Sequence, residues 1–126
     1  MAQKFVPRDF SKIKEATRLF DILDNYKENY PNQKVALAGK NTGSWVMYSP
    51  DDYKEYANNI SYALMSLGIE PGDKVAVIAS NRPEWNMLDM GIMQIGAVMV
   101  PIYPTISEND YKFILNNCEA KFVIME

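Results

Sequence analysis

Three apolar runs without regular polar alternation constrain the fold of this chain more than any other feature. They are KVAVIA at residues 74–79, AVMVPI at 97–102 and AKFVIM at 120–125. Consecutive apolar positions are typical of a strand in a sheet covered on both faces, which is usually a parallel sheet. Helical stretches separate the runs, at 83–95 and, after a capping Ser107, at 108–118. The pattern predicts an α/β fold with at least three parallel strands and right-handed helical crossovers.

The residues before the first apolar run predict two helices and a hairpin. Helical spacing of apolar residues indicates a helix over 16–30, ended by Pro31 and Asn32. Residues 34–49 indicate a hairpin around KNTG, in which Asn41 and Gly43 supply the unusual backbone angles. Ser49-Pro50-Asp51-Asp52 is typical of a helix start, because serine caps free N–H groups and carboxylates favour the positive end of the helix dipole. This second helix is expected to stop at Gly68.

Periodicity also predicts which helical side chains are buried. The expected set is Leu19, Phe20, Leu23 and Tyr26 in the first helix; Tyr53, Tyr56, Ile60, Ala63, Leu64 and Leu67 in the second; Trp85 and Leu88 in the third; and Tyr111, Ile114 and Leu115 in the fourth.

The composition excludes several classes of function. The net charge is −3 and both signs are scattered, so the basic stripe that nucleic-acid binding needs is missing from the sequence. The chain has no histidine, which excludes Ser-His-Asp and Cys-His catalysis and argues against an ordinary zinc site. Its single cysteine, Cys118, excludes an intrachain disulfide and indicates a reducing compartment. Residues 1–10 lack a signal-peptide core, and polar residues and Pro101 interrupt the apolar stretch 87–103, so we expect a cytoplasmic protein.

The turn SNRPEW at 80–85 is the strongest candidate for a ligand site. It follows a buried strand, at the edge where open parallel sheets bind ligands. Against this, it has no glycine to admit a phosphate closely, and Pro83 lacks a backbone donor. As a structural element it opens a helix, with Pro83 near the first position and Glu84 at the positive end of the dipole. The structural interpretation is favoured, and Arg82 is the residue by which a nucleotide contact would be tested.

Three further candidates have weaker support. KNTG at 40–43 lacks the order Gly, four residues, Gly-Lys-Ser/Thr of a phosphate loop, so it is interpreted as a turn. Asp51 and Asp52 diverge by about 100° on a helix, so capping is favoured over a catalytic carboxylate pair. Residues 1–15 carry four basic side chains that could touch an anionic membrane surface, although a solvated leader is the favoured interpretation.

A family resemblance rests on three pieces of sequence taken together. They are Gly68-Ile69-x-Pro71-Gly72-Asp73-x-Val75, Asn81-Arg82-Pro83-Glu84-Trp85 and Gly96-Ala97-Val98-x-Val100-Pro101-Ile102-Tyr103-Pro104-Thr105. Combined, they resemble the N-terminal region of adenylate-forming (AMP-binding) acyl-CoA synthetases, and more narrowly the long-chain fatty-acid–CoA ligase branch. The resemblance covers residues 16–126 and implies that they are an incomplete N-terminal portion of the AMP-binding domain, which follows the leader expected at 1–15.

The resemblance also implies what the parent enzyme does. With ATP and Mg²⁺ it would convert a fatty acid to an acyl-adenylate and pyrophosphate, then pass the acyl group to the thiol of coenzyme A. The phosphate loop, the adenine-binding segment, the hinge acid and the catalytic lysine of the family lie downstream of Glu126. No catalytic, cofactor-binding or metal-binding residue is therefore assigned, and we expect the fragment alone to be structural, inactive and without bound cofactor. Architectural roles are expected for Gly72, Gly96, Pro101 and Pro104.

Other interpretations stay open on the residues alone. The parallel-sheet pattern also fits a standalone nucleotide-binding module, a fold-level analogy, or a non-catalytic interaction domain. The chain stops directly after a core strand, which is typical of the front part of a longer protein. A sheet that ends there leaves an open edge, so we expect homo-oligomerisation or strand exchange between chains.

Overall fold

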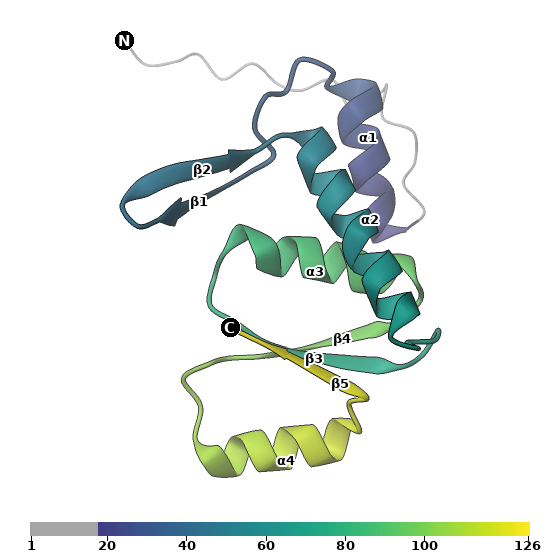
Figure 1. The fold of residues 1–126 in the computed structure, drawn as a ribbon, viewed down its shortest axis with the longest axis vertical. Helices are drawn as coiled ribbons and strands as arrows, with labels where there is room; N and C mark the ends of the chain where they lie inside the picture. Colours follow the sequence, from purple (N-terminus) through teal and green to yellow (C-terminus); the bar gives the residue numbers. More distant parts are fainter. Residues whose placement is uncertain (1–17) are drawn as a thin grey trace.

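The computed structural model describes residues 18–126, so the expected leader at 1–15 and the expected helix start at Ala16 lie outside the described residues (Figure 1). The elements are, in chain order, a 3₁₀ turn (Leu19–Asp21), α1 (Ile22–Asn29), β1 (Leu37–Asn41), β2 (Ser44–Tyr48), α2 (Pro50–Ser66), β3 (Lys74–Ile78), α3 (Pro83–Gln94), β4 (Val98–Ile102), α4 (Glu108–Cys118) and β5 (Phe122–Met125). Figure 1 shows α3 on one face of the three-stranded sheet and α4 on the other. The predicted α/β class and the N-terminal hairpin are confirmed.

Strand β3 is the centre of the sheet, because the strand order is β4-β3-β5 and both pairs are parallel. Val75, Ala76 and Val77 are fully buried, which confirms a strand covered on both faces. The chain passes from β3 to β4 on one side and returns to β5 on the other side. Crossovers of one handedness that run in opposite directions place their helices on opposite faces, so α3 and α4 enclose β3 between them.

The main core lies between the sheet and the helices α2 and α3. Its buried residues are Leu64, Ile69, Val75, Val77, Ile92 and Ala97. Trp85 and Leu88 pack against this cluster, half-buried, as predicted. The opposite face is covered less completely, because Ile114 and Leu115 of α4 are half-buried and no residue of α4 is fully buried.

The buried face of α2 differs from the predicted one. Tyr56 is 50% exposed and Leu67 is 59% exposed, and Ala63 also faces solvent. The predicted Tyr53, Ile60 and Leu64 do turn inward, but the positions between them on the same face are Ala57 and Ser61. The physical reason is the short distance between the two helices, since small side chains on α2 let α3 approach closely. The prediction from periodicity had chosen buried positions by hydrophobicity and did not take the helix spacing into account.

A glycine in α3 makes this close approach possible. A Cβ atom on Gly91 would lie 2.6 Å from Cγ2 of Ile60 and 2.8 Å from the backbone oxygen of Ala57. The buried Ser61 hydroxyl lies 2.8 Å from the Gly91 carbonyl oxygen and 3.1 Å from that of Ala57. The side-chain amide of Gln94 donates to the Ser61 oxygen at 3.0 Å. The α2–α3 interface therefore combines direct backbone packing with a satisfied buried hydroxyl.

Two N-terminal predictions need correction. The first helix begins with a 3₁₀ turn, and Leu19 in that turn is 61% exposed, whereas Leu23 is buried as predicted. In the hairpin the positive backbone angles belong to Thr42 (φ 47°) and Gly43 (φ 90°), while Asn41 is the last residue of β1. Two consecutive positive φ angles match a two-residue hairpin loop, in which the loop starts one residue later than expected.

The predicted helix caps are present. The amide of Asp52 donates to the Ser49 hydroxyl at 3.1 Å, and the Asp52 carboxylate accepts from the Ser49 amide at 2.8 Å. Ser107 and Asp110 form the same reciprocal pair at the start of α4. The stretch 87–103 is divided between α3 and β4, and within residues 18–126 no helix is long and apolar enough to cross a membrane.

Candidate functional site

The carboxyl ends of β3 and β5 carry the candidate site. Because β4 and β5 lie on opposite sides of β3, the connections diverge here, and open α/β sheets bind ligands where they diverge. The turn after β3 begins at Ser80, and Glu126 follows β5 directly. The parallel register pairs Ile78 with Met125, which brings these two residues together across the sheet.

The Glu126 carboxylate takes up the donors of the turn. It accepts from the Ser80 amide at 3.1 Å, from the Ser80 hydroxyl at 2.6 Å and from Nη1 of Arg82 at 2.8 Å. The hydrogen bonds from Ser80, together with the charge of Arg82, hold the pKa of Glu126 below its usual value. The turn therefore binds a carboxylate of its own chain, that of Glu126.

Arg82 joins this contact to helix α3. Its Nε donates to Glu84 at 2.8 Å and its Nη2 donates to the second Glu84 oxygen at 3.3 Å, a bidentate geometry. The guanidinium lowers the pKa of Glu84, and Glu84 in turn raises the pKa of Arg82. Tyr48 of β2 makes a further, smaller contribution that lowers the pKa of Glu84. The pKa of Tyr48 is raised by burial and then by Glu84.

A cavity of about 230 Å³ lies between this cluster and the hairpin. The hairpin side is lined by Gly39, Lys40, Val46 and Tyr48, and the other side by residues 80–84 and Glu126. The hairpin sits close to the turn, because a Cβ atom on Gly39 would lie 2.6 Å from Cδ of Pro83. The cavity thus presents two carboxylates and the Arg82 guanidinium, and both carboxylates already pair with Arg82.

These residues do not fit a nucleotide phosphate or its Mg²⁺. A phosphate at the turn would have to displace Glu126 from Ser80 and would lie beside the Glu84 carboxylate, which repels it. Within the described part of the chain, no group of three or more Cys, Asp or Glu residues is placed to hold a metal ion. The favoured interpretation of the turn as a helix start is consistent with α3 beginning at Pro83, with Glu84 in its first turn.

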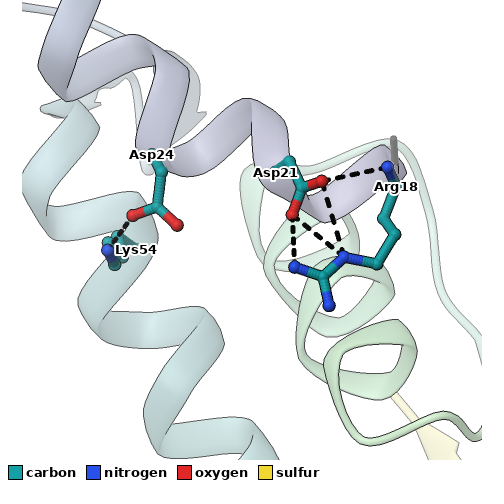
Figure 2. Close-up of polar contacts among 4 residues, drawn as sticks. All are labelled: Arg18, Asp21, Asp24 and Lys54. Atoms are coloured by element: carbon teal, nitrogen blue, oxygen red, sulfur yellow. Dashed lines mark hydrogen bonds and ion pairs between the residues drawn. The ribbon is translucent and has the colours of Figure 1, made fainter. Parts of the chain in front are cut away.

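The remaining charged contacts are structural. Figure 2 shows Arg18 in a bidentate contact with Asp21, whose Nη2–Oδ1 distance is 2.9 Å, and Lys54 of α2 paired with Asp24 of α1. At the opposite end of the sheet, Lys121 donates to Asp73 at 2.7 Å. Such exposed pairs position elements but contribute little to stability.

The role of Glu126 is the part of the site that the sequence did not predict. Its partner Ser80 lies 46 positions earlier, and the contact depends on β5 lying beside β3. The sequence signal that could have found it is a single carboxylate after an apolar strand, which carries little information. Arg82, chosen from the sequence as the residue to test, does lie at the centre of the cluster.

Comparison with known proteins places the chain in a family. The profile of the AMP-binding enzyme family matches residues 23–126. Fatty acyl-CoA synthetase A of Dictyostelium discoideum is 29% identical over 133 residues, which cover 95% of this chain and 20% of that protein. A long-chain-fatty-acid–CoA ligase of Mycobacterium bovis is 41% identical over 75 residues, 57% of this chain and 12% of the ligase. Acetyl-coenzyme A synthetase of Bacillus subtilis is 30% identical over 106 residues, 83% of this chain and 18% of the synthetase.

Solved structures agree with the sequence comparisons. A fatty acid AMP ligase from Legionella pneumophila superposes with a TM-score of 0.78 at 22% identity, over 88% of this chain and 20% of that one. The N-terminal subdomain of NpsA from Klebsiella oxytoca gives a TM-score of 0.74 at 25% identity, over 85% of this chain and 27% of that one. The chain thus spans at most a fifth of the length of the curated relatives named above. It belongs to the AMP-binding enzyme family and has the fold of a part of the N-terminal domain of adenylate-forming enzymes.

Proposed function

We propose that this chain is the N-terminal portion of a long-chain fatty-acid–CoA ligase. The observation that carries the proposal is the 41% identity to the Mycobacterium bovis ligase, supported by the match of nearly the whole chain to the Dictyostelium fatty acyl-CoA synthetase. In the parent, the fatty-acid carboxylate attacks the α-phosphorus of ATP and displaces pyrophosphate. The thiol of coenzyme A then attacks the acyl carbon and displaces AMP. Mg²⁺ would neutralise the phosphate charge in the first step.

The residues described here act as scaffold in this proposal. The turn at 80–83 fixes the end of β5 through Glu126 rather than holding a substrate, and no catalytic or cofactor-binding residue is assigned to residues 18–126. We therefore propose that the 126-residue chain forms no acyl-adenylate alone. We also propose that the parent is cytoplasmic.

To test this proposal, the protein encoded by the full open reading frame would be expressed and assayed. Pyrophosphate release with ATP should then depend on a long-chain fatty acid, and acyl-CoA should form when coenzyme A is added. Acetate and crotonobetaine are the matched controls, because the relatives include an acetyl-coenzyme A synthetase and a crotonobetaine/carnitine–CoA ligase. Preference for either control would refute the long-chain assignment, and adenylate formation by the 126-residue chain alone would refute the scaffold role.

A standalone nucleotide-binding module is the second candidate. It is favoured by a separate cavity of about 300 Å³ at the ends of β3 and β4, lined by Ala79, Asn81, Trp85, Pro101, Ile102 and Tyr103. Aromatic side chains at such a cavity can stack on a base. Calorimetric titration of the 126-residue chain with ATP and with AMP discriminates, because saturable binding would favour the module.

We further propose that the isolated chain self-associates through β5. Among residues 18–126 this strand pairs only with β3, and its four residues carry neither charge nor proline to block another strand. On the α4 side, Val123 is 45% exposed and Met125 is 70% exposed. Sedimentation velocity should show a species larger than the monomer whose fraction rises with concentration. A Val123→Lys variant should be monomeric, and a compact wild-type monomer at high concentration would contradict the proposal.

A further inference from the structure

We draw no further inference here: the strongest candidate, the cavity of about 300 Å³ at the ends of β3 and β4 between Trp85, Pro101 and Tyr103, already carries the nucleotide-binding alternative proposed for this chain, and nothing in the structure shows what covers it in the parent.

Discussion

The close contact between α2 and α3 makes Gly91 the position at which one added methyl group should matter most. In Gly91→Ala the new Cβ meets Ile60 and the Ala57 backbone below 3.0 Å, so the helices must separate. Overpacking of this kind costs about 1–3 kcal/mol. Separation also weakens the bond between Ser61 and the Gly91 carbonyl, worth about 1 kcal/mol, while alanine's higher helix propensity returns about 1 kcal/mol. The expected net loss in free energy of unfolding is about 2 kcal/mol.

Urea denaturation followed by circular dichroism measures this loss. With a slope of about 1–3 kcal/mol per molar urea, the midpoint should fall by about 1 M. Ala63→Gly, at an exposed position of α2, is the control that measures helix propensity without a contact. Ile60→Ala should cost less in the Gly91→Ala background than in the wild type, because it removes the clashing methyl group. A Gly91→Ala variant as stable as the wild type would refute the view that glycine sets this helix spacing.

Three other predictions concern single side chains. Glu126→Gln should make the stability of the fold less sensitive to acid. The pKa of Glu126 is lowered in the folded state, so its contribution to stability is present above the ordinary value of 4.5 and is lost as pH falls through the folded-state pKa. If the thermal midpoints of the wild type and the variant fell equally on acidification, the prediction would be wrong. Burial raises the pKa of Tyr53 to about 12, so its contribution to folding stability is present below pH 10.0 and is lost as pH rises toward 12. Tyr53→Phe should therefore remove the tyrosinate step at the highest pH from an ultraviolet titration of the protein. Ser49→Ala should lower the free energy of unfolding, measured by urea denaturation, by about 1 kcal/mol, because the helix loses its capping hydroxyl. Ser44→Ala, at an exposed position of β2, is the control and should leave the free energy of unfolding unchanged.

The sequence predicted those features of the fold that depend on neighbouring residues. The apolar run at 74–79 predicted a doubly covered strand, and Val75 to Val77 are indeed fully buried. Ser49 and Ser107 predicted two helix starts, because a capping hydroxyl acts within three positions of itself. The buried face of α2 was predicted only in part, since Ala57 and Ser61 are buried for their small size and not for their hydrophobicity.

The candidate site was less predictable because it depends on strand order. Consecutive apolar strands and helices fit an order β3-β4-β5 as well as the observed β4-β3-β5. In the first order, β5 would lie two strand spacings from β3, about 10 Å away, and Glu126 could not accept the hydrogen bond from the Ser80 amide at 3.1 Å. The motif around Arg82 identified the turn that forms the site. The partner of that turn, Glu126, depends on the chain crossing back over the sheet so that β5 lies beside β3.

This dependence makes the Ser80–Glu126 contact a reporter of topology as well as a part of the site. Each hydrogen bond to Glu126 comes from the turn after β3, so the contact exists only when β5 has docked on the side opposite β4. Ser80→Ala and Glu126→Gln should therefore be coupled in a double-mutant cycle, although 46 positions separate them in the chain. Additive effects would mean that the two side chains do not meet in solution. In that case the donors of the turn at 80–83 would be available to a ligand, and a nucleotide contact at this turn would have to be considered again.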